Sequence, residues 1–204
     1  MAALTRSNRP MKIIFATHNA HKLTEVNQLL GGKFDVVSLT EIGYKQDIEE
    51  NGNTFVDNAL IKAQTIAKHT DMAVFADDSG LEVTALNGAP GVHTARFAGL
   101  PVNHAANNQL LLQKLHGITN RSAHFKTVIA LVYSNQVHYF EGSIAGHIAL
   151  QLTGTDGFGY DPLFIPDGYN KSFAQMTLDE KNKISHRGLA IQKLIAFLNQ
   201  WNPL

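Results

Sequence analysis

The stretch Met72-Ala73-Val74-Phe75-Ala76-Asp77-Asp78-Ser79-Gly80 decides the fold class and points to the chemistry. Its first five residues are all apolar, which is typical of an interior strand that is covered on both faces. We expect this strand to end abruptly at the two aspartates. Adjacent carboxylates at the end of a buried strand repel each other and are poorly solvated unless a cation or hydrogen-bond donors compensate them. The stretch therefore predicts a buried strand of an α/β protein that runs directly into a polar site.

Strand and helix patterns precede this stretch. Residues 12–17 form a compact apolar run, and residues 22–30 then carry apolar side chains at helical spacing, which predicts a strand, a loop and a helix. Residues 35–39 have the pattern of a second short strand. Thr54-Phe55-Val56-Asp57 matches a capping box, which predicts a helix that runs to about His69.

A long antiparallel ribbon is predicted further along the chain. Apolar residues alternate from 123 to 132, Ser134-Asn135 follow as turn residues, and a second alternating run extends from 137 to 143. Residues 146–152 are expected to add another strand before a Gly-rich loop. These segments predict a hairpin of two long strands.

Further helical patterns complete the chain. A helix is expected over residues 103–115, Thr177-Leu178-Asp179-Glu180 repeats the capping-box pattern, and Ser185 can cap a final amphipathic helix. We find no internal repeat and no linker. The sequence therefore predicts an α/β fold: a single elongated domain with a mixed sheet, a long antiparallel ribbon and a central cleft between two lobes. We expect this domain to span residues 11–204, after a disordered N-terminal extension of residues 1–10.

Composition restricts the partners and the compartment. The chain has 204 residues, of which 44% are hydrophobic, so it can bury a sizeable core. Its 17 Lys and Arg balance its 17 Asp and Glu, so no overall positive field favours a nucleic-acid polymer or an anionic membrane. The sequence contains no Cys, which excludes thiolate ligands and fits a reducing compartment. We therefore expect a cytoplasmic protein that holds any anionic partner with a local cluster of residues.

The acidic residues are candidate catalytic and metal-binding groups. Asp77 and Asp78 lie side by side, and Glu50 adds a third oxygen ligand from an acidic connection. Proteins typically hold Mg²⁺ with one or two carboxylates together with substrate phosphates, so this set favours a magnesium site. The alternative interpretation of the two aspartates is an exposed acidic turn.

The loop Thr17-His18-Asn19-Ala20-His21-Lys22 is a candidate substrate-binding segment. It lies between the first predicted strand and its helix, so its backbone N–H groups and the helix dipole can receive a phosphate, with Lys22 as counter-charge. The glycines of a Walker loop are missing. The alternative is a solvated loop in which Lys22 is a surface residue and the histidines have no special role.

Two further clusters are candidates for contact with a base. Phe158 is flanked by two glycines and can present its ring to a base, although it and Tyr160 can equally anchor a loop onto the core. Lys181, His186 and Arg187 fall near a predicted helix junction. The rigid guanidinium fork of Arg187 suits directional recognition of carbonyl or phosphate oxygens, whereas a solvated helix face is the alternative.

Taken together and in order, these motifs resemble those of the inosine triphosphate pyrophosphatase family, which hydrolyses purine nucleoside triphosphates that carry a wrong base. The resemblance runs from about Lys12 to Leu198 and covers nearly the whole chain. The matching segments are Phe15–Lys22, Glu50–Phe55, Asn58-Ala59, Ala76–Leu81, Pro90–Val92, Ala95–Gly99, Gly157–Pro162, Lys181-Asn182 and Ser185–Arg187.

The resemblance implies a Mg²⁺-dependent enzyme, commonly a homodimer, that converts ITP, dITP and XTP to the nucleoside monophosphate and pyrophosphate. It implies phosphate binding by Thr17, Asn19 and Lys22, metal binding by Glu50 and Asp78, activation of water by Asp78, and a place for Ser79 beside the substrate. It also implies a nucleoside site formed by Phe158, Gly159, Tyr160 and Asp161, a substrate contact from Lys181, and recognition of the base edge by His186 and Arg187.

Several alternatives stay open at this point. His18 stands where the family usually has a small residue, and Asp77 is an alternative base to Asp78. One rival function is a non-catalytic nucleotide-binding regulator, which the intact carboxylates disfavour. Another is a pyrophosphatase of the related Maf type acting on other modified nucleotides, which the match at Ser185-His186-Arg187 disfavours.

Overall fold

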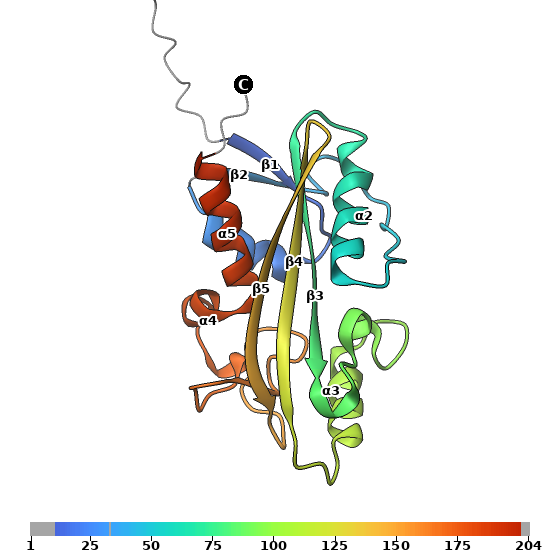
Figure 1. Cartoon of the computed structure of the whole chain (residues 1–204), viewed down its shortest axis with the longest axis vertical. Helices are drawn as coiled ribbons and strands as arrows, with labels where there is room; N and C mark the ends of the chain where they lie inside the picture. Colours follow the sequence, from blue (N-terminus) through green and yellow to red (C-terminus); the bar gives the residue numbers. More distant parts are fainter. Residues whose placement is uncertain (1–10, 33, 201–204) are drawn as a thin grey trace, which may run out of the picture.

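The computed structural model describes residues 11–32 and 34–200, and these residues form one six-stranded mixed sheet with helices on both faces (Figure 1). The strands lie in the order β2-β1-β3-β4-β5-β6, and β1 pairs in parallel with both β2 and β3, whereas the remaining pairs are antiparallel. The strands are β1 (Met11–Phe15), β2 (Phe34–Ser38), β3 (Ala73–Val83), β4 (Ser122–Tyr133), β5 (Gln136–Ile148) and β6 (Phe164–Pro166). The expected mixed sheet and long ribbon are confirmed. The extension expected over residues 1–10 lies outside the described residues.

The helices begin where the sequence supplies caps. They are α1 (Ala20–Leu30), α2 (Phe55–Ala67), α3 (His104–Lys114), α4 (Leu178–Ile184) and α5 (His186–Gln200), with short 3₁₀ helices η1 (Thr84–Leu86), η2 (Gly91–Arg96) and η3 (Phe173–Gln175). Both predicted capping boxes are present, at the start of α2 and of α4. The Ser185 hydroxyl accepts the N–H of Gly188, which caps α5 as expected. Each such cap contributes about 1 kcal/mol to helix stability.

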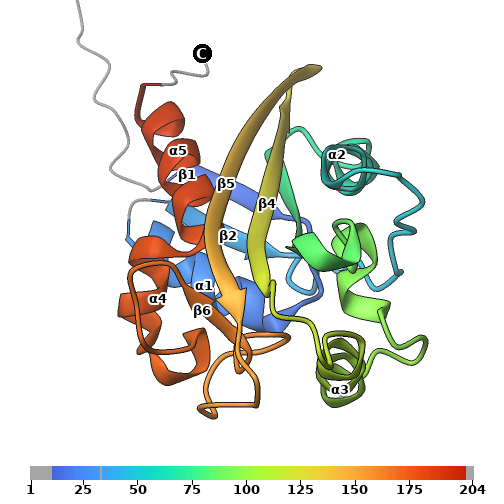
Figure 2. The same cartoon turned by 60° about the horizontal axis from the view of Figure 1, so that its bottom comes forward.

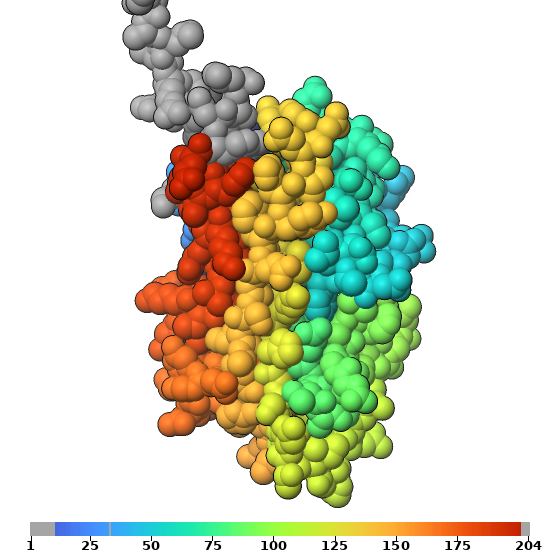
Figure 3. Space-filling view, viewed as in Figure 1, coloured from blue at the N-terminus to red at the C-terminus, as the bar shows by residue number. Residues whose placement is uncertain are grey.

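Three hydrophobic clusters hold the layers together. One fills the space between the sheet and helices α1 and α5, and a second fills the opposite face under α2. A third forms beneath the far half of the β3–β5 ribbon, around Phe125, Phe164 and Phe173. Figure 2 shows α5 and α2 on opposite sides of the ribbon, and the space-filling view in Figure 3 shows the elongated outline and the β5 surface between those helices. Among the described residues, no helix has the length and apolar character needed to cross a bilayer.

The prediction that the central strand ends at the aspartates is wrong. β3 continues through them to Val83 because β4 keeps pairing with it, with Asp77 opposite Ile129 and Asp78 opposite Val128. Neighbouring side chains of a strand point to opposite faces of the sheet. The two carboxylates are therefore separated by the sheet, and each meets its own cations.

The prediction of a separate strand over residues 146–152 is also wrong. Residues 146–148 belong to β5, which stays in register with β4 as far as the pair Ser122 and His147. At the end of β5 the guanidinium of Arg121 donates to the carbonyls of Ile148 and Ala149, so these carbonyls are satisfied although no further strand continues there. The additional strand is β6, further along the chain.

Candidate active site

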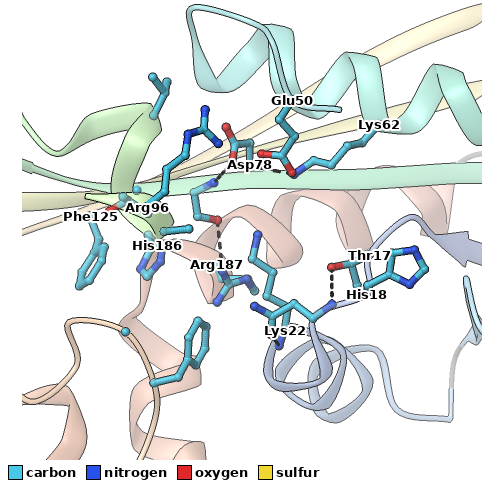
Figure 4. A pocket seen from close by; sticks show the side chains of 18 of the residues that line it. Thr17, His18, Lys22, Glu50, Lys62, Asp78, Arg96, Phe125, His186 and Arg187 are labelled. Atoms are coloured by element: carbon cyan, nitrogen blue, oxygen red, sulfur yellow. Dashed lines mark hydrogen bonds and ion pairs between the residues drawn. The ribbon is translucent and has the colours of Figure 1, made fainter. Parts of the chain in front are cut away.

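A cleft of about 310 Å³ lies at the centre of the molecule, where the β1–α1 loop, β3, η2 and the α4–α5 junction meet (Figure 4). The predicted site residues that line it are Thr17, His18, Asn19, Lys22, Glu50, Asp78, Ser79, Phe158, Gly159, Tyr160, Asp161, Lys181, His186 and Arg187. Three predicted residues do not line the cleft in the part of the chain that the structure describes: Ala20, His21 and Asp77. The fold thus gathers into one cleft segments that are widely separated in the sequence.

The β1–α1 loop is held by its own side chains. The Asn19 side chain accepts the N–H of Lys22 at 3.1 Å, and the Asn19 N–H donates to the Thr17 hydroxyl. This leaves the N-terminus of α1 at the cleft, where a helix dipole favours an anion. His18 donates to the carbonyl of Gln46, and His21 turns away and stacks on Phe158 with the ring centroids 5.2 Å apart. His21 lines a neighbouring cavity of about 420 Å³ instead of the cleft.

Asp77 is buried, and three donors surround its carboxylate. Lys22 Nζ lies 3.0 Å away, Arg187 Nε lies 3.2 Å away, and the Ser79 hydroxyl donates from 2.8 Å. Burial by itself raises the pKa of Asp77, but the charges of Lys22 and Arg187 outweigh it and hold the pKa far below its ordinary range. A carboxylate this acidic and this fully engaged is a weak base.

Asp78 points to the other face of β3 and lines the cleft. Asn58 donates to one of its oxygens at 3.0 Å, and the Ser79 N–H donates to the other at 2.9 Å. Burial raises the pKa of Asp78, and the charge of Lys62 only partly opposes this. Of the two aspartates, Asp78 therefore has the geometry and the basicity suited to taking a proton.

Glu50 and Asp78 converge on one cation, Lys62. Lys62 Nζ lies 2.8 Å from Glu50 and 3.8 Å from Asp78 (Figure 4). Burial lowers the pKa of Lys62, but the two carboxylates outweigh it and the net shift is upward. Sequence reasoning missed Lys62, although a charged residue four positions after Asn58 on the buried side of α2 was a usable signal.

The nucleoside end of the cleft is built on buried charges and aromatic rings. Lys181 Nζ donates to Asp161 at 2.7 Å and lies 5.1 Å from the centroid of the Phe158 ring. The Phe158 N–H donates to Asp161, and a Cβ at Gly157, where φ is 74°, would overlap that carboxylate. Tyr160 is buried and donates to the carbonyl of Thr94, so it anchors the loop, and both Tyr160 and Phe158 line the cleft.

His186 is buried and neutral. Its ring stacks on Phe125 at 4.5 Å between centroids, and within the described ranges its Nδ1 has no hydrogen-bond partner. Burial lowers the pKa of His186 well below its ordinary value, and the nearby charges of Arg187 and Lys181 lower it further. This nitrogen is itself shielded from solvent, so it is an unsatisfied polar atom within the wall of the cleft. Sequence reasoning did not identify Phe125, which looks like any core residue of an alternating strand.

Arg187 joins several buried polar side chains of the site. Its Nε bonds to Asp77, its Nη1 to Glu25 and its Nη2 to the Ser79 hydroxyl. Sequence reasoning also assigned no role to Arg96, which lines the cleft and forms no ion pair within the part of the chain that the structure describes. Arg96 lies in the segment Ala95–Gly99, which matches the family motifs, but nothing in the sequence indicated what this side chain does.

Comparison with known proteins shows which family the chain belongs to. The family model described as the Ham1 family matches residues 13–197. The chain is 51% identical over 188 residues to a dITP/XTP pyrophosphatase of Porphyromonas gingivalis, which covers 92% of this chain and 97% of that protein. It is 47% identical over 190 residues to a dITP/XTP pyrophosphatase of Christiangramia forsetii, with 93% and 100% covered.

Solved structures show the same fold. A HAM1 protein from Coxiella burnetii superimposes with a TM-score of 0.86 at 40% identity, covering 94% of this chain and 100% of that one. The Staphylococcus aureus Ham1 protein superimposes with a TM-score of 0.84 at 39% identity, covering 93% of this chain and 98% of that one. The resemblance read from the sequence motifs is confirmed, and the chain belongs to the Ham1 family.

Proposed function

We propose that this protein hydrolyses deaminated purine nucleoside triphosphates, namely dITP, XTP and ITP, to the nucleoside monophosphate and pyrophosphate. The observation that carries the proposal is a single cleft with carboxylates and lysines at one end and a buried histidine beside aromatic rings at the other. Such a cleft matches a ligand with a polyphosphate at one end and a planar base at the other. The names of the P. gingivalis and C. forsetii relatives support it.

The phosphate end provides positive charge and backbone donors. Lys22 and Lys62 both line the cleft, and the N-terminus of α1 lies next to them. Cleavage of the anhydride between the α and β phosphates needs charge neutralisation and a positioned water, while the protein takes little covalent part. No nucleophilic side chain is required for this reaction.

The carboxylates fit a Mg²⁺ ion as the resident metal. Glu50 and Asp78 already share one cation, and the upward pKa shift of Asp78 indicates that its charge is incompletely compensated. Proteins typically hold Mg²⁺ with one or two carboxylates together with substrate phosphates, and Glu50 and Asp78 would be those carboxylates. When bound, Mg²⁺ would neutralise phosphate charge and acidify water.

Asp78 is the base in this proposal. It lines the cleft, its pKa is raised by burial, and Asn58 and the Ser79 N–H fix its orientation. A positioned carboxylate that takes a proton from the attacking water contributes typically about 10²- to 10⁴-fold to the rate. Asp77 serves instead to hold Lys22 and Arg187.

Base selection follows from hydrogen-bond polarity. Hypoxanthine and xanthine present an oxygen acceptor at position 6, where adenine presents an amino donor. Arg187 uses three of its five N–H donors within the protein, so it retains capacity to donate, and His186 lines the cleft beside it. Two donors facing each other in a buried site are unfavourable, which disfavours adenine.

The proposal is tested by a pyrophosphate-release panel over dITP, XTP, ITP, dATP and dGTP, with Mg²⁺ and with Mg²⁺ replaced by a chelator. We expect rapid release from the three deaminated substrates, little from the others, and none without the metal. Equal rates on dITP and dATP would contradict the base assignment. Full activity with the chelator would contradict the metal assignment.

The assembly and the compartment are also proposals. A homodimer rests on the family resemblance, and light scattering coupled to gel filtration measures it directly. A cytoplasmic location rests on the absence of Cys in the sequence, and its balanced charge argues against nucleic-acid or membrane partners. Cell fractionation and binding to anionic vesicles or duplex DNA test these expectations.

A further inference from the structure

Six buried or nearly buried charges form one chain of alternating sign beside the cleft. In order they are Lys22, Asp77, Arg187, Glu25, Lys181 and Asp161. Lys22 lies at the phosphate end, and Asp161 lies in the loop that carries Phe158 at the nucleoside end. Three positive and three negative charges cancel, which is how a network this large can be buried.

Glu25 is the link that joins the two halves of this chain. It lies on the buried face of α1, and its side chain is only 5% exposed. One carboxylate oxygen accepts from Lys181 Nζ at 2.7 Å, and the other accepts from Arg187 Nη1. Glu25 therefore ties together side chains from α4 and α5, on either side of the helix junction at Ser185.

Charge compensation alone does not explain this contact. Lys181 already has Asp161 at 2.7 Å, and Arg187 already has Asp77 at 3.2 Å. Each cation would keep one carboxylate partner without Glu25. Burial raises the pKa of Glu25, yet the charges of Arg187 and Lys181 outweigh it and lower the pKa, so the group is a carboxylate that both cations attract. What Glu25 adds is a fixed separation between the two cations.

We propose that Glu25 is a specificity-determining positioning residue that holds Lys181 and Arg187 at the spacing needed for the nucleoside. This inference rests on the proposed function. Glu25 is not among the described residues that line the cleft, so it acts through the two cations and not on the substrate. Both cations also lie within 6 Å of the Phe158 ring centroid, which makes their spacing part of the wall against which a base is placed.

Two variants separate positioning from charge. Glu25→Gln keeps the size but loses the charge and one acceptor oxygen, so it can hold only one of the two cations. Glu25→Asp keeps the charge but is one methylene shorter, so it cannot span both. Glu141→Gln is the matched control, because Glu141 is half exposed on β5 and pairs only with Lys126, at 3.4 Å, in the described structure.

The measurement is the ratio of kcat/KM for dITP to that for dATP, together with inhibition by inosine monophosphate and by pyrophosphate. We expect both Glu25 variants to lower the ratio by about tenfold or more, which corresponds to one hydrogen bond to a charged group. Inhibition by inosine monophosphate should weaken and inhibition by pyrophosphate should persist. Glu141→Gln should match the parent in every measurement.

The outcomes distinguish the possible failures. An unchanged ratio in Glu25→Asp together with a lower melting temperature in Glu25→Gln would mean that Glu25 only compensates charge, and the inference would be overturned. If Glu25→Gln fails to fold, the ratio in Glu25→Asp decides. If the parent itself does not prefer dITP, the proposed function fails, and calorimetric binding of inosine monophosphate to parent and variants then decides the role of Glu25.

Discussion

Replacing each aspartate of β3 by asparagine should separate a structural carboxylate from a catalytic one. In Asp77→Asn, the buried cations Lys22 and Arg187 lose a shared negative charge that lies 3.0 and 3.2 Å away. Breaking a buried ion pair by removing one partner costs about 3–5 kcal/mol. One kcal/mol shifts the melting temperature of a domain of this size by roughly 2–4 °C, so we expect a decrease of roughly 6–20 °C.

Asp78→Asn should behave in the opposite way. The asparagine oxygen can still accept one of the two hydrogen bonds, from Asn58 or from the Ser79 N–H, and the lost charge is one that burial already disfavours. A loss of stability on the order of 1 kcal/mol is expected, which lowers the melting temperature by only a few degrees. Turnover should fall about 10²- to 10⁴-fold because the base and a ligand charge are both removed.

The assay combines thermal unfolding, followed by circular dichroism, with pyrophosphate release from dITP at saturating Mg²⁺. Activity is compared at a temperature at which both variants are folded. A melting temperature for Asp77→Asn equal to that of the parent would refute the structural role of Asp77. Parent-like turnover in Asp78→Asn would refute its assignment as the base and leave Asp77 as the candidate.

Three further predictions follow from the same geometry. Lys22→Ala should raise KM for dITP and lower kcat, because it removes positive charge from the phosphate end, and unchanged steady-state kinetics would make Lys22 a structural residue. Burial lowers the pKa of His186 well below 6.5, so below about pH 6.5 the unfolded chain binds a proton at this ring more readily than the folded chain does. The contribution of the neutral ring to the free energy of unfolding is therefore fully present above about pH 6.5 and is lost as the pH falls. Melting temperatures between pH 7.5 and 5.5 should therefore fall more steeply in the parent than in His186→Gln, and parallel curves would contradict this. Gly142→Ala should lower the melting temperature and the activity, because the added Cβ would overlap the His186 carbonyl and lie 2.6 Å from the Ala190 nitrogen. Such overpacking costs about 1–3 kcal/mol of folding free energy. Ser143→Ala, at the exposed neighbouring position, is the control.

Local features of the structure were predictable because their causes are local. A capping box joins residues three apart, so the starts of α2 and α4 were visible at Thr54 and Thr177. The ribbon of β4 and β5 follows from alternating apolar residues on either side of a two-residue turn. The end of β3 was predicted wrongly because the length of a strand depends on its partner strand. β4 pairs with Asp77, Asp78, Ser79 and Gly80, although these residue types are typical of a turn.

The sequence by itself determined the class of fold, the cleft residues that occur in recognisable motifs, and the family, since all of these depend on residue identity and order. Only the tertiary structure decided which charged side chains form ion pairs with one another. Lys22 and Asp77 are 55 positions apart, and Glu25 and Lys181 are 156 positions apart, so no spacing along the chain predicts that they pair. Packing also assigned different tasks to Asp77 and Asp78, because a strand directs adjacent side chains to opposite faces, where one meets Arg187 and the other meets Lys62.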